Sequence, residues 1–275
     1  MTPSLLLLTA LFVVPFFWAI GMGFTNLNLW SGEETRFIGF DNFKRLFRDA
    51  GFLNSVKVTL IFLAAAVSGH FVLGFLFANL VRIKGIWGRK IIQISMLIPW
   101  LTPGLVAAYM WRSVFNTDFG WLNQILVGVG LERVDWLISY PLLSVLIVNW
   151  SRGMAIAYLL LSAALSNIPE SVYDAAYIDG ANSWQTLTKI KIPMIKYSIL
   201  VTLLFSTFMT LLAFDMIYGL TGGGPMSRTE VFSIFIYHNG FQDMQLGYAG
   251  AISTVILLIS LVLGVAYIRS LRVDF

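Results

Sequence analysis

Few side chains in this 275-residue sequence could do chemistry, and they are not grouped along the chain. Arg152 and Asp215 are charges inside strongly apolar segments, and His70 and His238 are the two histidines. A membrane-embedded enzyme would need acidic, histidine or serine side chains clustered at one site. There is no cysteine, which excludes disulfides, thiol nucleophiles and thiolate metal sites. The sequence therefore favours neither catalysis nor a bound metal.

The composition is that of a membrane protein. Hydrophobic residues make up 58% of the chain and charged residues 12%, and the mean hydropathy is +0.80. Soluble domains carry about twice this charged fraction. The length allows roughly six or seven spans of ~20 residues and no soluble domain of ordinary size. The net charge of +4 is not collected on one face, so no nucleic-acid partner is expected.

The apolar runs predict an all-α membrane protein with six transmembrane helices in a single domain, residues 1–275. The first run is interpreted as an uncleaved helix, because it lacks a basic leader and a clear small-residue cleavage site. The spans are expected at about 4–24, 56–81, 91–111, 141–165, 195–220 and 248–268, with a loop at 166–194. Helical spacing of apolar residues over 40–47 predicts a short amphipathic helix on the membrane surface.

Charge distribution predicts the orientation of these spans. An even number of spans puts both termini on one side, together with the loop from Arg82 to Lys90, which has four basic residues (Arg82, Lys84, Arg89 and Lys90) and no acid. The positive-inside rule makes that side cytoplasmic. The basic residues of segment 44–48 lie on the other side and count against this orientation, but the compact loop outweighs them.

The two intramembrane charges are expected to meet. Such charges are costly and usually face the bundle interior in pairs. Arg152 lies about ten residues from the outer end of its span and Asp215 about six from that of its own, at ~1.5 Å per residue. We predict an ion pair that braces an outer gate; the alternative is two separately solvated charges in a cavity. His70 is expected to be packed or hydrogen-bonded.

The long polar interruption between the fourth and fifth spans predicts two short helices joined by a turn. Pro169 ends the preceding helix, and Glu170 suits the first turn of a new one. Gly180 permits a sharp turn at its end, and Pro193 suits the entry of the next span, where its missing N–H costs nothing. The plain alternative is an ordinary loop between helices.

This stretch resembles the EAA loop of ABC importer permeases, in which E-A-A is followed by a glycine four residues on and then by I-x-(L/I)-P. The matching residues are Asp174, Ala175, Ala176, Asp179, Gly180, Ile190, Ile192 and Pro193. Asp174 stands where the family usually has glutamate, which keeps the charge on a side chain one methylene shorter. Segments 39–43, 98–100, 111–112, 120–123, 214–225 and 247–251 also resemble sugar-type permeases, in the family's order. The likeness, to the maltose and glycerol-phosphate type, covers nearly the whole chain.

The resemblance implies a type I ABC importer permease fold with a cytoplasmic EAA coupling helix and no catalytic role. Such a subunit forms half of a pathway for a sugar, an oligosaccharide or a polyol phosphate in a bacterial or archaeal cytoplasmic (inner) membrane. Its partners would be a second permease, expected to be a different chain, two copies of a cytoplasmic ATPase and an extracytoplasmic solute-binding protein. ATP and Mg would be used by the ATPase, and no cofactor is expected here. The sequence indeed has no G-x-x-x-x-G-K-[ST] motif.

The resemblance also implies roles for particular residues. ATPase coupling is expected from Asp174, Ala175, Ala176, Asp179, Gly180 and Pro193, with Asp174 paired to a basic residue of the ATPase and both alanines in its groove. The expected solute path is Gly153 with Ser206, Met209, Thr210 and Ala213, the last four of which follow i, i+3, i+4, i+7 spacing. Serine and threonine could instead join helices by hydrogen bonds. A proton-coupled secondary transporter is the main alternative function, and it leaves the polar stretch unexplained.

Overall fold

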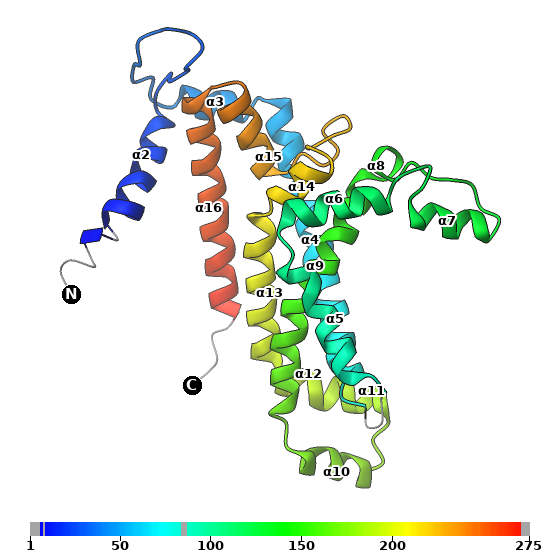
Figure 1. Ribbon diagram of the computed structural model, residues 1–275. Coiled ribbons are helices and arrows are strands. Elements are labelled where there is room, and N and C mark those ends of the chain that lie inside the picture. The colour runs from blue at the N-terminus through cyan, green and yellow to red at the C-terminus, as the bar shows by residue number, and fades with distance from the viewer. Residues whose placement is uncertain (1–5, 8, 84–86, 271–275) are drawn as a thin grey trace. The chain divides into compact units, whose positions relative to one another are not determined.

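The computed structural model describes residues 6–7, 9–83 and 87–270 (Figure 1). These residues form helices and loops, and their one β pairing is an isolated antiparallel bridge between Thr25 and Phe37. The chain divides into two compact units: Met1–Leu60 with Gly222–Val265, and Ile61–Thr221 with Ala266–Phe275. We call them unit 1 and unit 2. Helix α4 (Ala50–Leu80) contributes residues to both.

Unit 1 is built on a small aromatic core. Besides the start of α4, its elements are η1 (Thr9–Val13), α2 (Val14–Met22), α3 (Asp41–Leu46), α15 (Phe232–Tyr237), η3 (His238–Gln242) and α16 (Leu246–Ser270). The buried core residues are Leu46, Phe52, Phe232, Phe235, Tyr248 and Ile252. Glycines let the end of α2 approach α16, because a Cβ at Gly250 would lie 2.8 Å from the Gly23 nitrogen.

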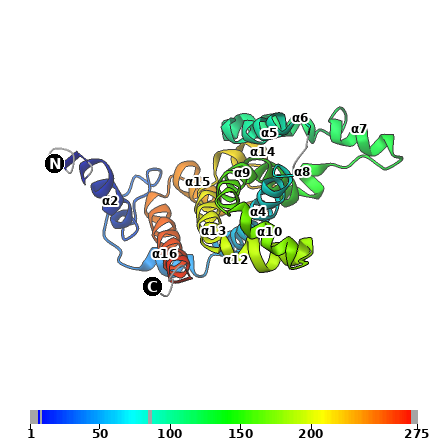
Figure 2. The same ribbon diagram turned by 90° about the horizontal axis from the view of Figure 1, so that it is seen from below.

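Unit 2 is organised around α9 (Pro141–Ser166). Helix α9 packs against α5 (Arg89–Leu101), α6 (Gly104–Val114), α8 (Trp136–Ser139), α13 (Lys196–Leu211) and α14 (Asp215–Leu220). Seen from below, α9 lies in the middle of these helices (Figure 2). The other elements are α7 (Trp121–Gly128), α10 (Glu170–Ile178), α11 (Ser183–Gln185), η2 (Thr186–Lys191) and α12 (Ile192–Met194). Its apolar core draws mainly on α4 and α9.

Three helices match predicted spans closely. By length and composition α4, α9 and α16 could each cross a membrane, and they correspond to the second, fourth and sixth predicted spans. Two bent helix pairs bring the number to as many as five. The first predicted span begins outside the described residues, and its described part is the shorter apolar helix Thr9–Met22. The count of six spans therefore stays a prediction.

The third and fifth predicted spans are interrupted. Helices α5 and α6 meet at 109°, where Thr102 is extended and Pro103 precedes α6. Proline lacks an N–H and disfavours helical backbone at the residue before it, so the stretch predicted as the third span, about 91–111, is two helices and not one. That the two form one span stays a prediction. The fifth run breaks at 212–214, between α13 and α14, and Asp215 begins the second helix.

The close approach of α4 and α9 predicts a stability effect. A Cβ at Gly74 would lie 2.6 Å from the Ala157 Cβ and 2.8 Å from the Tyr158 nitrogen. We expect Gly74→Ala to lower the thermal unfolding temperature in detergent, at a cost of about 1–3 kcal/mol from overpacking. Gly128→Ala is the matched control, because a Cβ there would meet no described residue within 4 Å apart from its chain neighbours and its own helix backbone. Equal unfolding temperatures for the two variants would contradict the close packing.

Candidate functional site

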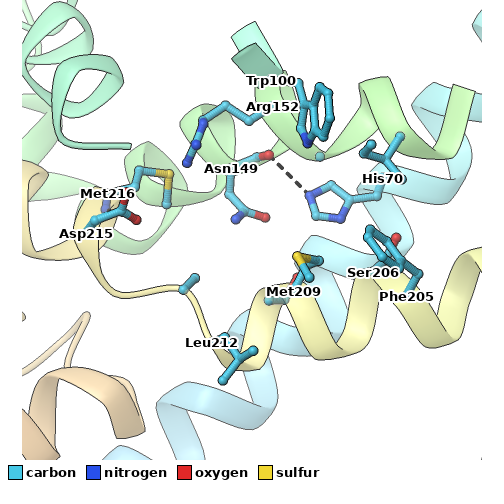
Figure 3. A pocket seen from close by; sticks show the side chains of 14 residues that line it. His70, Trp100, Asn149, Arg152, Phe205, Ser206, Met209, Leu212, Asp215 and Met216 are labelled. Carbon is cyan, nitrogen blue, oxygen red and sulfur yellow. Dashed lines mark hydrogen bonds between the residues drawn. The ribbon is translucent and has the colours of Figure 1, made fainter. Parts of the chain in front are cut away.

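A pocket of about 250 Å³ lies within unit 2 and is lined from α4, α5, α9, α13 and α14. We call it the α9–α13 pocket (Figure 3). It is lined by His70, Trp100, Asn149, Arg152, Gly153, Ile156, Phe205, Ser206, Met209, Thr210, Leu212, Ala213, Asp215 and Met216. Apolar and aromatic walls with a few polar groups are typical of small-molecule sites.

The residues predicted for the solute path come together in this pocket. Gly153 contributes from α9, and Ser206, Met209, Thr210 and Ala213 contribute from α13 and the residues just after it. Helical spacing explains this, since positions i, i+3, i+4 and i+7 share one helix face. Helix α9 packs against α13, and its Gly153 lines the same pocket as these residues. Their contact with a solute stays a prediction.

The predicted ion pair between Arg152 and Asp215 is not formed, although both residues line the pocket. Among the described residues no salt bridge joins them, and Arg152 instead donates Nη2–H to the Thr102 carbonyl at 3.1 Å. The bend between α5 and α6 explains this contact, because an interrupted helix leaves carbonyls without intrahelical partners. The bend therefore offers Arg152 a backbone acceptor that a continuous third helix would not offer.

Asp215 is held by helix ends instead. It is the first residue of α14, and its Oδ1 accepts from the Met216 backbone N–H at 2.8 Å. It also lies against the first residue of α6, since a Cβ at Gly104 would collide with its carboxylate. Helix N-termini carry partial positive charge, so both stabilise an anion there. The carboxylate therefore does not depend on arginine for a partner.

Sequence reasoning gave His70 no role in the solute path and did not single out Asn149. His70 is buried on α4, and its Nε2 lies 3.2 Å from the Asn149 carbonyl oxygen on α9. This hydrogen bond confirms the expectation of a packed or hydrogen-bonded histidine. The signal for Asn149 was available, because it precedes Arg152 by three residues and so shares its helix face.

Several residues that line this pocket carry a buried polar atom without a hydrogen-bond partner. Among the described residues, the buried side-chain atoms without a hydrogen bond are His70 Nδ1, Asn149 Oδ1, Arg152 Nε, Tyr173 Oη and Thr210 Oγ1. Four of these five residues line the α9–α13 pocket. A buried polar atom without a partner costs about 1–3 kcal/mol, and most native polar atoms avoid that cost. Their concentration here indicates a site built for a polar ligand.

The predicted coupling helix is α10, at the end of unit 2 opposite α6 and α14 (Figure 1). Asp174 and Ala175 face outward, and beside them Tyr177 and Ile178 are 85% and 82% exposed. Ala176 is 6% exposed and packs inside this chain. The expectation that both alanines enter a partner's groove is therefore corrected for Ala176, because it lies on the inward face of the helix, with Val172.

The turn after α10 forms as the glycine predicted. Gly180 has φ +73°, its N–H donates to the Tyr177 carbonyl at 3.1 Å, and the Ala181 N–H donates to the Ala176 carbonyl at 2.9 Å. This hydrogen-bond pair is a Schellman motif, which favours glycine at the left-handed position. Asn182 and Gln185 then form a reciprocal capping box that starts α11. Pro193 lies in the first turn of α12, just before a 73° bend into α13.

The loop that carries α10 is fastened to the helix bundle. Lys191 donates from Nζ to Asn79 Oδ1 on α4 at 2.8 Å, and Arg82 donates to Ser166 Oγ at the end of α9 at 3.3 Å. Burial, with the positive charge of Arg82 nearby, lowers the pKa of Lys191, which lies outside the predicted spans. These contacts surround a polar pocket of about 470 Å³ that Asp174 also lines.

The missing ion pair gives a testable prediction. In a double-mutant cycle on unfolding, Arg152→Ala and Asp215→Asn should be additive to within about 0.5 kcal/mol, because the two side chains bond to different partners. The same cycle on Glu230 and His238 of unit 1, whose side chains lie 2.8 Å apart, serves as the positive control. A coupling energy between Arg152 and Asp215 as large as that of the control pair would show that the two side chains do form an ion pair.

Comparison with known proteins agrees with this architecture. Residues 70–273 match the family described as binding-protein-dependent transport system inner membrane component. The sulfoquinovosyl glycerol transport system permease protein SmoG of Agrobacterium fabrum is 31% identical over 99% of this chain and 89% of its own. The trehalose/maltose transport system permease protein MalF of Thermococcus litoralis is 34% identical over 82% of this chain and 78% of its own.

The fold also has a counterpart among solved structures. A bacterial ABC transporter involved in importing the acidic polysaccharide alginate matches with a TM-score of 0.84 at 23% identity, over 98% of this chain and 92% of the other. That likeness concerns the fold alone. The family match spans most of the sequence, and relatives above 30% identity are permease proteins of transport systems. This chain therefore belongs to the binding-protein-dependent inner-membrane components, the non-catalytic permease subunits of ABC importers, whose ATPase is a separate chain.

Proposed function

We propose that this chain forms half of the translocation pathway for a sugar, an oligosaccharide or a polyol phosphate, and that the α9–α13 pocket lies on that pathway. The observation that carries the proposal is the group of buried polar atoms without partners, two of them on Asn149 and Thr210. Sugar hydroxyls both donate and accept hydrogen bonds, so they suit a wall with both kinds of group. Relatives named for trehalose, maltose and sulfoquinovosyl glycerol support the same solute class.

We further propose that α10 docks into a cytoplasmic ATPase present in two copies, which binds the ATP and Mg while this chain binds no cofactor. Asp174, Ala175, Asp179 and Gly180 would form or shape the docking surface, with Asp174 paired to a basic residue of the ATPase. Support comes from the exposed face of α10 and from its fixed C-terminal turn. A helix presenting an apolar face with a flanking charge is a common docking element between proteins.

The remaining parts of the assembly follow from the same proposal. A second permease, expected to be a different chain, would complete the pathway, and a solute-binding protein would deliver the solute on the extracytoplasmic side. A structure of the alginate transporter in complex with its periplasmic protein gives a precedent for that partner. Both termini would be cytoplasmic, on the side of α10, as the basic loop between Arg82 and Lys90 predicts.

Co-purification tests the docking of α10. Asp174→Arg should reduce the ATPase retained with the permease in detergent at least tenfold, because it reverses the charge offered to a basic partner. Asp118→Arg is the matched control, since Asp118 is also an exposed aspartate of unit 2 and lies in the loop before α7. Equal retention by wild type and both variants would refute docking through Asp174.

Energy coupling separates this proposal from a proton-coupled carrier, which would use Arg152, Asp215 and His70 as a proton path. Solute uptake into vesicles should survive a protonophore while ATP is supplied inside. It should stop when the ATPase carries an inactivated Walker A lysine. Uptake that collapses with the protonophore and ignores the ATPase variant would favour the carrier.

A further inference from the structure

We propose that His70 is a specificity-determining residue of the pathway, whose Nδ1 accepts a hydrogen bond from one hydroxyl of the solute. The inference rests on the proposed carbohydrate pathway and goes beyond it by assigning a solute contact to α4. The helix faces expected from the sequence lie on α9 and α13. His70 adds a third wall to the pocket.

The contact of His70 with Asn149 determines which ring nitrogen carries the proton. The Nε2 atom of His70 lies 3.2 Å from the Asn149 carbonyl oxygen. A carbonyl can only accept, so Nε2 is the nitrogen that carries the proton. In a neutral imidazole the other nitrogen then has a free lone pair. Nδ1 is therefore an acceptor, and a hydroxyl is the group that it can bind.

This acceptor is buried and has no protein partner among the described residues. His70 is 4% exposed, and no group in the described part of the chain hydrogen-bonds to its Nδ1. Figure 3 shows the ring between Asn149 on one side and Ser206 and Met209 of α13 on the other. His70 lines the pocket, so a solute held there is the partner that we assign to this nitrogen, which is costly to leave without one.

The imidazole ring of His70 is held in position from α9. A Cβ at Gly153 would collide with Nε2 and Cε1 of the imidazole, so the glycine provides the space that the ring occupies. The carbonyl of Asn149, one turn earlier, holds Nε2. Asn149 and Gly153 are positioning residues, and they fix where Nδ1 can meet a solute. A site fixed in this way rejects analogues that lack the recognised hydroxyl, because its own polar group is left unpaired.

A purely structural role would have a different signature. If His70 only braced α4 against α9 through the Asn149 bond, a side chain that replaces Nε2 would restore function. Glutamine can place an amide N–H near the Nε2 position but leaves no acceptor at Nδ1. Asparagine can place its oxygen near the Nδ1 position but does not reach Asn149 as well. The two substitutions therefore separate bracing from recognition.

The experiment uses the complete importer, with both permeases, the ATPase and the solute-binding protein, reconstituted in lipid nanodiscs. Stimulation of ATP hydrolysis is measured with trehalose, maltose, sulfoquinovosyl glycerol and glycerol 3-phosphate. For each stimulating solute, the analogues that each lack one hydroxyl are then compared with the parent. The readout is the ratio of half-maximal concentrations, analogue over parent, for wild type, His70→Gln, His70→Asn and Gly153→Ala.

We expect wild type to discriminate against one particular deoxy analogue by about tenfold or more, which corresponds to ~1.4 kcal/mol. His70→Gln and Gly153→Ala should reduce that single ratio to about twofold or less and leave the ratios for the other analogues unchanged. His70→Asn should keep part of the discrimination. Gly128→Ala, where an added Cβ meets nothing, is the matched glycine control and should behave as wild type.

The outcomes separate the inference from the function on which it rests. If the parent solute stimulates wild type and His70→Gln keeps every ratio, recognition by Nδ1 is refuted while carbohydrate import stands. Loss of all ratios together would also refute it, because it would show a structural role. If none of the four solutes stimulates the wild-type importer, the proposed solute class fails and the inference fails with it.

Discussion

The close packing of α4 against α9 is the constraint on which unit 2 depends. Helices in an apolar medium gain little from burying more apolar surface, so close backbone approach and hydrogen bonds must hold them together. Three glycines allow that approach: added Cβ atoms at Gly69, Gly74 and Gly153 would meet Trp150, Ala157 and His70. The Trp150 indole N–H also donates to the Ala65 carbonyl at 3.0 Å. The same packing that stabilises the bundle therefore places His70 against Asn149.

Interruptions of the helices supply the polar chemistry that continuous helices would lack. A transmembrane helix satisfies its own backbone, so a broken one offers carbonyls and N–H groups to side chains. The break at Pro103 gives Arg152 the Thr102 carbonyl, and the start of α14 gives Asp215 a backbone N–H. Each of these costly charges therefore has a backbone hydrogen bond of its own, while Arg152 Nε is left without a partner. Their positions around one pocket leave the remaining polar groups for a ligand.

The sequence predicted the helix limits and turns that neighbouring residues determine. It did not predict the contacts that depend on how the helices pack. The limits of α9, the start of α10 after Pro169 and the turn at Gly180 follow from proline, glycine and apolar length, and the structure agrees. The bend at Pro103 could have been inferred from the proline, but its 109° angle depends on neighbouring helices. The partner of Arg152 and the position of His70 depend on contacts between residues far apart in the chain, for which a single sequence carries no signal.

Helix α4 offers a physical link between the proposed docking element and the pocket. It runs without interruption over Ala50–Leu80 and carries both His70 and Asn79, which are nine residues, or about 13 Å of helix, apart. Asn79 is bonded to Lys191 in the loop that follows α10, and His70 lies in the pocket wall. A continuous helix moves as a rigid body, so a displacement of α10 by a partner would shift the pocket wall together with the loop. Coupling over this distance needs only such a rigid element and two alternative packings of the bundle around it.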